Sequence, residues 1–505
     1  MSNIADVFFR AAAKDPDRIA IIHHDRSITY GELARQVRST AAHFQRKGLG
    51  RGDRVLVFVP MGIDLYRVVL ALFSIGAGAV FLDAWVSWKR MELCCELARC
   101  KGFIGGWKVL ALAWLSRPVR RIPIKLGTSL PSEGKSETEV VDPDDTALIT
   151  FTTGSTGTPK AARRSHGFLA AQFEALIDEL APSPADVDMT TLPIVLFLNL
   201  GIGCTSVIPD FKPSKPASFS AEVIAHELRR HTVDRLTASP SQVSALATHL
   251  TTTKTRLPGL KKIFTGGAPV FPRDAALMRE AFPGAAVKVV FGSTECEPIS
   301  SITAERLVED HGEVDKGLCV GNVFHRTALR IIRIEDRALP TARAGELLAM
   351  TLLPGSLGEI IVSGDHVLRS YFNNEEAYRR NKIIVDGTIW HRTGDSGFTD
   401  AQGQLFLTGR CAQLIRKDDQ VLAPFVWEDK LMRHHGVVRG TLIEREGAIV
   451  AVVQAASGAD RNTLAAELRS AHEELADVAF IERMPMDPRH QSKIDQEALR
   501  RMIGL

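Results

Sequence analysis

Hydrophobic and polar positions in the first part of the chain predict helices alternating with buried strands. Between residues 28 and 48 apolar side chains recur every three or four positions, which predicts a helix. Those side chains are Leu33, Val37, Ala41 and Phe44. Continuous apolar runs at 54–60 and 78–84, with a helical segment between them, predict two buried strands. This alternation is typical of parallel sheets that helices cover.

The same pattern recurs three times, and each time a short strand runs into a polar, glycine-bearing loop. These strand-to-loop segments are TALITF (146–151), KKIFTGGAP (261–269) and AVKVVFGSTE (286–295). Ligands of such folds bind where loops leave the carboxyl ends of strands. We therefore expect the three loops to converge on one site.

After about residue 340 the pattern changes to short strands bounded by Gly and Asp. The runs at 358–364, 388–395 and 403–410 predict an antiparallel β subdomain. Beyond Arg410, a strand at 447–455 and a helix at 461–475 predict a compact α+β unit. The fold class is thus α/β, with a large N-terminal domain (1–410) of helix-covered sheets and a β subdomain. A small, mobile α+β C-terminal domain (411–505) follows a boundary near 410–413.

Composition and charge narrow the class of protein. The 505 residues are 45% hydrophobic and 24% charged, as in ordinary globular proteins, which excludes wholesale disorder. A net charge of +3 gives no electrostatic footprint for nucleic acid or an anionic membrane. The longest apolar run, 68–82, is shorter than the about 20 residues of a membrane-spanning helix. With no apolar secretory signal near the amino terminus, we expect a soluble cytoplasmic protein.

The seven cysteines are an odd number and are scattered, which predicts free thiols in a reducing compartment. Cys94, Cys95 and Cys100 cluster, but no second ligand pair completes a four-ligand metal set. We therefore expect no metal bound by cysteine.

The stretch FTTGSTGTPKAARRSHG (151–167) is the strongest chemical signal. Its hydroxyls and backbone amides suit phosphate oxygens, and Lys160 supplies a cation. The residues concerned are Thr152, Thr153, Gly154, Ser155, Thr156, Gly157 and Lys160. The stretch lacks the Gly-Lys-Ser/Thr of a P-loop. It predicts an oligophosphate site, and the alternative is a solvated Thr/Gly loop.

TTGSTGTPK resembles the phosphate-loop signature of the adenylate-forming superfamily, which includes acyl-CoA synthetases, the adenylation domains of peptide synthetases and luciferases. Other motifs resemble the family's in the same order along nearly the whole chain. They are GGAP (266–269), FGSTE (291–295), RTGD (392–395), GR (409–410) and the segment around Lys493.

The resemblance implies ATP and Mg²⁺ as cofactors and gives each motif a role. Glu295 would hold the magnesium and Thr294 would contact the α-phosphate. Asp395 would accept two ribose hydroxyls, with Arg410 as a nearby donor, and Lys493 would bridge the substrate carboxylate and the α-phosphate. The adenine would lie by Gly266, Gly267, Ala268, Phe291, Gly292 and Ser293. Taken singly, Glu295 could instead be a surface charge, Asp395 a turn residue and Lys493 a helix-cap residue.

Departures from the family pattern concern the thioester-forming step. No glycine occurs between Gly409 and Gly436, the hinge residue is Gln413, and Ala161 and Ser492 replace usual glycines. The segments 165–172, 192–217, 294–300 and 484–494 resemble those of the olefin-pathway β-lactone synthetases. Those relatives activate a 2-alkyl-3-hydroxy fatty acid with ATP, and the 3-hydroxyl then closes on the activated carboxyl without CoA. The resemblance therefore implies a β-lactone synthetase, which could associate with other enzymes of its pathway.

The acyl site is expected along the apolar segment 192–203, with Phe197, Asn199 and His166 as candidate substrate contacts. For Asn199 the alternative is a turn or cap, and for His166 it is a structural histidine. Two other functions stay open. One is an acyl-CoA or acyl-carrier-protein ligase, which would use a thiol such as CoA, and the other is a nucleotide-binding pseudoenzyme.

Overall fold

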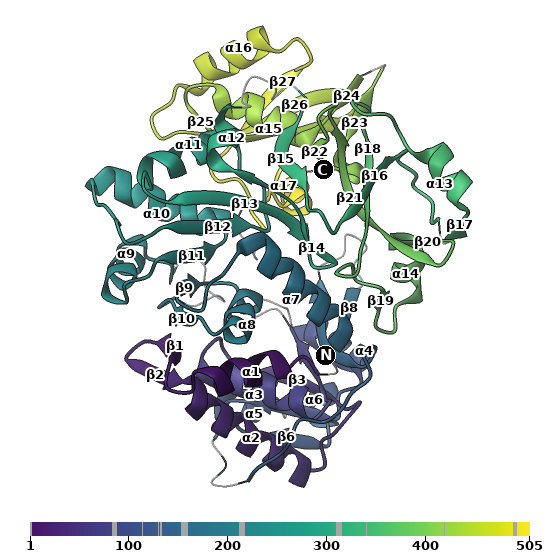
Figure 1. Cartoon of the computed structure of the whole chain (residues 1–505). Coiled ribbons are helices and arrows are strands. Elements are labelled where there is room, and N and C mark those ends of the chain that lie inside the picture. The colour runs from purple at the N-terminus through teal and green to yellow at the C-terminus, as the bar shows by residue number, and fades with distance from the viewer. Residues whose placement is uncertain are drawn as a thin grey trace.

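The computed structural model describes residues 3–82, 88–113, 115–129, 131, 134–152, 160–211, 218–309, 316–339, 341–418, 420–487 and 492–504. Two large sheets with helices between and around them form most of the molecule, and a smaller sheet lies at the C-terminal end (Figure 1). Within the described part of the chain, no helix is long and apolar enough to cross a membrane.

The seven-stranded sheet has the order β19-β8-β7-β4-β3-β5-β6. Its parallel strands are β3 (Arg54–Phe58), β4 (Gly78–Phe81), β5 (Gly102–Gly105), β6 (Ile124–Leu126) and β7 (Thr146–Thr152). Antiparallel β8 (Lys160–Ser165) and β19 (Ser370–Tyr371) complete it. The helices of this part are α2 (Tyr30–Arg46), α3 (Ile63–Ser74), α4 (Trp88–Ala98), α5 (Trp107–Ala113) and α6 (Arg117–Arg120). The predicted helix after residue 28 and the two predicted buried strands are confirmed.

The fifteen-stranded sheet has a parallel centre and antiparallel flanks. The centre consists of β9 (Val187–Thr190), β10 (Thr205–Ile208), β11 (Arg235–Ala238), β12 (Lys262–Gly266) and β13 (Ala286–Ser293). One flank holds β1 (Ile19–His23) and β2 (Arg26–Thr29). The other holds β14 (Cys296–Thr303), β15 (Leu318–Val323), β16 (Ala328–Ile332), β17 (Thr341–Ala342), β18 (Gly358–Ser363), β20 (Lys382–Val385), β21 (Thr388–Thr399) and β22 (Gln404–Arg410).

The predicted antiparallel strands after residue 340 are present, but they do not form a sheet of their own. Strand β22 pairs with β15, and β15 pairs with β14, so hydrogen bonds continue into the parallel centre. Strand β21 is also longer than the short strand expected at 388–395. The strands that precede the three expected loops are divided between two sheets, with β7 in one and β12 and β13 in the other.

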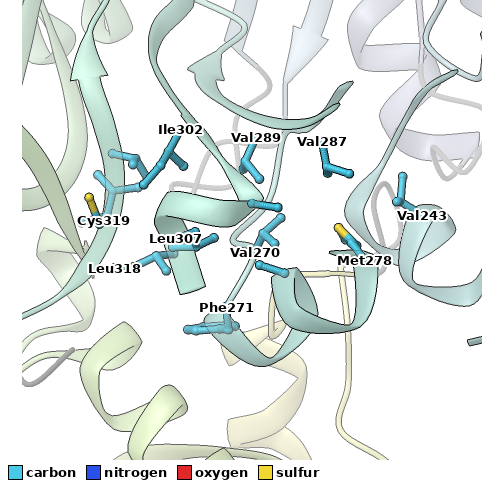
Figure 2. Close-up of a cluster of buried hydrophobic side chains, with 14 of the residues drawn as sticks. Val243, Val270, Phe271, Met278, Val287, Val289, Ile302, Leu307, Leu318 and Cys319 are labelled. Atoms are coloured by element: carbon cyan, nitrogen blue, oxygen red, sulfur yellow. The ribbon is translucent and has the colours of Figure 1, made fainter. Parts of the chain in front are cut away.

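Helices cover the two faces of the central sheet differently. Helices α9 (Ala221–Arg230), α10 (Pro240–Thr253), α11 (Pro272–Ala281) and α12 (Ala304–Glu309) supply one buried cluster. In that cluster Val287 and Val289 of β13 lie beside Val270 and Met278 (Figure 2). The neighbouring Lys288 belongs to the other face, where its ammonium pairs with Glu179 at 2.7 Å. Glu179 lies on α7 (His166–Leu180), which runs with α1 (Asp6–Lys14) and α8 (Pro193–Ile202) between the sheets (Figure 1).

The C-terminal part begins with a 3-10 turn at Cys411–Gln413 and packs on α11. Its elements are β23 (Ile415–Lys417), β24 (Gln420–Leu422), α15 (Pro424–Arg433), β25 (Val437–Arg445), β26 (Ala448–Ala455), α16 (Arg461–Ala471), β27 (Asp477–Ile481) and α17 (Gln496–Met502). The Arg273 guanidinium donates to the carbonyls of Val437 at 3.1 Å and Val438 at 2.8 Å. The domain boundary near 410–413 stays a prediction. The remaining helices are α13 (Ala344–Met350) and α14 (Glu375–Asn381).

Candidate active site

The turn between β13 and β14 places Glu295 at the carboxyl end of the parallel strands. The Tyr371 hydroxyl donates to Glu295 Oε1 at 3.0 Å. Tyr371 lies on β19, which pairs with β8, the strand that follows the predicted phosphate loop. One hydrogen bond thus joins the Glu295 turn of the large sheet to β19 of the other sheet, next to the strand that follows the phosphate loop.

Two lysines, Lys160, which is half-buried, and Lys382, which is buried, act electrostatically on this carboxylate. Lys160 donates to Asn381 Oδ1 at 3.1 Å, and the next residue, Lys382, is wholly buried. The Lys382 ammonium donates to the carbonyl of Leu368, whose amide donates to the Glu295 carbonyl at 2.7 Å. Lys382 therefore braces the segment that carries Tyr371 against the Glu295 turn.

Burial and neighbouring charges set the ionisation of this cluster. Burial lowers the pKa of Lys382 to about 7, although Glu295 acts to raise it. Burial also lowers the pKa of Lys160, against the raising effect of Glu295. For Glu295, burial would raise the pKa, but Lys382, the hydrogen bond from Tyr371 and Lys160 act to lower it. Because burial lowers the pKa of His391 to about 3, this ring is neutral at pH 7. A buried carboxylate thus stays ionised among cations that suit an anionic ligand.

The residues present fit a magnesium ion that arrives with a nucleotide. Among the described residues there is no group of three or more His, Cys, Asp or Glu side chains that could hold a metal. Magnesium is commonly held by one or two carboxylates together with substrate phosphates and water. Glu295 is an ionised carboxylate of this kind, beside the Lys160 strand. Such a magnesium would neutralise charge on the phosphates.

The two charged residues of the RTGD motif pair with different partners. Arg392 is buried and its guanidinium pairs with the buried Glu359 at 2.6 Å. Asp395 pairs across the β21–β22 ladder with Arg410, whose Nε lies 3.2 Å from Asp395 Oδ1. Arg410 also acts on the pKa of Lys160, so the Asp395–Arg410 pair belongs to the same electrostatic cluster. An ionised carboxylate here can accept two hydroxyl hydrogen bonds.

Glycines keep the backbone of β12 and β13 close together at the adenine-side loop. A Cβ on Gly266 would lie 2.3 Å from the Val290 carbonyl oxygen, and Gly267 has φ +84°. Ala268 follows in the same loop. Phe291, on the neighbouring strand, packs against the cluster of buried side chains on the α10–α11 face. The predicted adenine residues are therefore neighbours at one sheet edge.

The phosphate loop itself is only partly described. Thr153, Gly154, Ser155, Thr156 and Gly157, and the side chain of Thr152, lie outside the described residues. Their phosphate-binding roles stay predictions. Lys160, which follows the loop, is placed in the cluster around Glu295.

The loop that carries Lys493 docks against the large sheet. Ser492 Oγ accepts a hydrogen bond from the Ser241 amide at 3.2 Å. Ser241 lies in the first turn of α10, directly after β11, and β11 neighbours β12. Asp487 Oδ1 accepts from the Lys493 amide at 2.9 Å. These bonds fix the Lys493 backbone at the edge where the strands of the site end.

The three residues expected to contact the acyl group lie in the packed core. The Asn199 amide donates to the buried Asp188 carboxylate at 2.7 Å. Phe197 packs edge-on against Phe73, which also contacts the His166 ring. His166 Nδ1 accepts from the Ile4 amide at 3.2 Å. For Asn199 and His166 these contacts favour the structural alternative over a substrate contact.

We expect His166 to make the protein less stable in acid. Burial lowers the pKa of His166 to about 4, with Asp145 acting to raise it and Arg51 to lower it. The imidazole of the unfolded chain titrates near 6.5. The contribution of neutral, buried His166 to the free energy of unfolding is therefore fully present above that pH and is lost as the pH falls toward 4. The loss would amount to about 3 kcal/mol. His166→Gln should therefore reduce the dependence of the unfolding free energy on pH between pH 4 and 6.5, as measured in denaturant titrations. His435→Gln, at an exposed position, is the control, and an unchanged slope in H166Q would contradict the assignment.

Sequence reasoning missed Tyr371, Lys382 and His391. A lysine that opens the apolar strand KIIV is an available signal, because an unpaired buried lysine is costly. The pairing of Lys382 with His391 across β20 and β21 follows from the two-residue hairpin loop Asp386–Gly387, a second local signal that sequence reasoning did not use.

Comparison with known proteins gives the class to which this fold and site belong. Residues 8–372 match the family model described as AMP-binding enzyme. The chain therefore belongs to the AMP-binding enzyme family, whose members similar to it are AMP-forming, acid-activating ligases.

Particular relatives are similar over most of their length. An olefin beta-lactone synthetase of Xanthomonas campestris pv. campestris is 30% identical over 550 residues, which cover 99% of this chain and 97% of the relative. A 2-succinylbenzoate–CoA ligase of Bacillus licheniformis is 26% identical over 84% of this chain and 82% of the relative. The structure of the O-succinylbenzoate CoA synthetase of Bacillus subtilis with ATP and magnesium superposes with a TM-score of 0.78. The two sequences are 22% identical, and the superposition covers 96% of this chain and 97% of the synthetase chain.

Proposed function

We propose that the protein uses ATP and magnesium to convert a 3-hydroxy fatty acid into its acyl-adenylate, and then into a β-lactone. The observation that carries this proposal is the similarity to olefin beta-lactone synthetase, which extends over 99% of the chain. The similarity covers the small C-terminal part as well as the segments of the nucleotide site.

The cluster around Glu295 supports the adenylation step. A carboxylate that attacks the α-phosphate must approach a polyanion, so cations are needed where negative charge accumulates. Lys160 and Arg410 supply charge from the large domain, and Lys493 supplies it from the docked C-terminal loop. Glu295 would hold the magnesium, and Asp395 would accept the ribose hydroxyls. Pyrophosphate leaves as the carboxylate oxygen bonds to phosphorus.

The second step needs no additional substrate. The 3-hydroxyl oxygen of the acyl group bonds to the carboxyl carbon while the bond from that carbon to the phosphate oxygen breaks. AMP leaves with the electron pair, and the hydroxyl proton passes to solvent. Because the nucleophile is tethered to the activated carbon, proximity offsets part of the strain of the four-membered ring.

The second candidate is an acyl-CoA ligase, which the similarity to 2-succinylbenzoate–CoA ligase favours. It shares the first step and differs in the nucleophile, which would be the CoA thiol. The two functions are therefore separated by the product and not by the adenylation site.

Product mass spectrometry tests the proposal. The protein is incubated with ATP, Mg²⁺ and a panel of plain and 3-hydroxy fatty acids, each with and without CoA. We expect a CoA-independent product lighter than the 3-hydroxy acid by one water, with an equal amount of AMP. A CoA thioester without any lactone would contradict the proposal and support the ligase. Absence of acid-dependent AMP release with every acid would contradict both.

A further inference from the structure

Helices α4, α5 and α6 form a layer over one face of the seven-stranded sheet. Their inner side chains pack in one buried cluster with Phe103 of β5 and Phe151 of β7. Cys95 comes from α4, Val119 comes from α6, and Val109 of α5 packs against them. Helices α5 and α6 lie at the end of the molecule away from the C-terminal part (Figure 1). The residues of these two helices that do not face the cluster therefore form an outer surface of the large domain.

This outer side exposes large apolar side chains. Trp107, the first residue of α5, is 75% exposed, and Leu115, just after α5, is 76% exposed. Leu93 of α4 is also exposed. The run WKVLALAWL (107–115) has a single charged residue, Lys108, whose ammonium lies 5.4 Å from the centre of the Trp107 ring. One exposed apolar side chain is ordinary, but several on one helical layer indicate a surface that contacts another molecule.

The same segment carries many cations. Between Glu96 and Glu133 the chain has seven Lys and Arg residues and no Asp or Glu. Those exposed on or beside α5 and α6 are Lys108, Arg117, Arg120 and Arg121. The net charge of +3, which on its own gives no footprint for an anionic membrane, thus hides a strong local excess of positive charge.

Acidic side chains near this layer compensate only part of the charge. Asp53 pairs with Lys101 at 2.8 Å, at the end of the layer's sheet. Glu92 of α4 accepts a hydrogen bond from the Ser116 hydroxyl at 3.0 Å. Glu96, also on α4, is exposed. The four exposed cations on and beside α5 and α6 therefore still outnumber the acids of the layer.

An anionic bilayer surface matches this combination of groups. Lys and Arg attract anionic lipid headgroups, and Trp and Leu enter the boundary between headgroups and acyl chains. Nucleic acid would also attract the cations, but its phosphates offer nothing to an exposed Leu115. A second copy of the chain in a symmetric contact would place these cations against each other, which is unfavourable.

We infer that the α5–α6 surface binds the anionic surface of a lipid bilayer. This surface consists of Trp107, Lys108, Leu115, Arg117, Arg120 and Arg121. The attachment is peripheral, since no helix in the described part of the chain is long and apolar enough to cross a membrane. The inference goes beyond the proposed function and does not depend on it, because the surface shares no residue with the nucleotide site. Long acyl chains partition into bilayers, so attachment would bring the protein to the phase that holds its proposed substrate.

The test is co-sedimentation of the full chain with vesicles, without ATP or acid. One set of vesicles contains equal parts of phosphatidylglycerol and phosphatidylcholine, and the other contains phosphatidylcholine alone. Each Lys or Arg near an anionic bilayer strengthens binding by about fivefold, so we expect binding to the anionic vesicles to be at least about 100-fold tighter. Arg120→Gln/Arg121→Gln should weaken that binding by about 10- to 30-fold. Leu115→Ser should weaken it by about 3- to 10-fold, because the lost methyl groups no longer enter the bilayer.

Matched variants elsewhere on the molecule control for charge and apolar exposure in general. Arg500→Gln/Arg501→Gln removes two adjacent exposed arginines from α17. Leu353→Ser removes a leucine that is 80% exposed. Both controls should bind anionic vesicles like the unmodified protein. An unchanged free energy of unfolding in every variant shows that a loss of vesicle binding does not come from unfolding.

The inference is overturned if the unmodified protein does not sediment with anionic vesicles, or binds both kinds of vesicle equally. It is also overturned if the control variants lose as much binding as the variants of the α5–α6 surface, since net charge would then suffice. Tighter binding to a DNA duplex than to anionic vesicles, through the same arginines, would replace the lipid by nucleic acid. Each of these results leaves the proposed function untouched, because no substrate takes part in the measurement.

Discussion

Replacing Lys493 with alanine is expected to slow acid-dependent pyrophosphate exchange by about 100- to 1,000-fold, the loss typical when one preorganised electrostatic group is removed. The reason is its position, since Asp487 and Ser241 hold the backbone of its loop where the strands of the site end. An ammonium placed there can stabilise charge that develops as the carboxylate attacks phosphorus. Because that interaction forms mainly in the transition state, kcat should fall more than KM rises.

The measurement is exchange kinetics together with the free energy of unfolding. The unfolding free energy should change little, because the loop is held by backbone atoms and by Ser492 and Asp487. Lys417→Ala removes an exposed lysine from β23 and serves as the control. Near-normal exchange in Lys493→Ala would show that another cation acts in adenylation.

Local patterns were sufficient to predict most of the strands that lead into the site, and the order of the motifs came from the resemblance to a known family. The strands that precede the three expected loops fall where apolar runs meet Gly, Ser and Thr, because short-range periodicity and turn chemistry determine them. The β21–β22 ladder brings Asp395 opposite Arg410, as expected from their proposed roles at one site. The nearness of Asp395 to Arg410 could therefore be predicted from the sequence.

The residues around Glu295 that sequence reasoning missed are brought together by strand pairing, part of it between segments far apart in sequence. Tyr371 reaches the site because β19 pairs with β8, far away in sequence. Lys382 reaches it because β20 pairs with β21 and its ammonium meets the Leu368 carbonyl. The β19–β8 pairing has no signal in local composition, whereas the β20–β21 hairpin is indicated by the Asp386–Gly387 turn between its strands.

The acyl-site residues show a different difficulty. Asn199 is a polar residue in an apolar run, and such a residue either contacts a ligand or satisfies a buried polar partner. Its partner is Asp188, whose pKa burial raises to about 6. Asp188 lies on β9, shortly before the apolar run, and its contact with Asn199 depends on how β9 and α8 pack. The choice between the two alternatives therefore needed the structure.

Replacing Glu295 with glutamine is expected to raise the magnesium concentration needed for half-maximal exchange by at least about 10- to 100-fold. Loss of a side chain that only hydrogen-bonds to a metal ligand already has an effect of that size. Glu295 is the ionised carboxylate beside Lys382 and Lys160, and glutamine keeps its shape but not its charge. The substitution also removes the negative charge that raises the pKa of Lys382 and of Lys160. Both lysines would then ionise less readily, which would weaken the attraction of the site for phosphate as well.

Magnesium titrations of exchange at saturating ATP separate the charge of Glu295 from its packing. Tyr371→Phe removes the hydrogen bond to Glu295 Oε1 but keeps the carboxylate, so its magnesium requirement should shift much less. Glu376→Gln removes an exposed carboxylate from nearby α14 and should leave the requirement unchanged. If Glu295→Gln kept the magnesium requirement of the unmodified protein and lost only maximal rate, Glu295 would not be a metal ligand. Its carboxylate would then act by holding Tyr371 and the two lysines in place for the nucleotide.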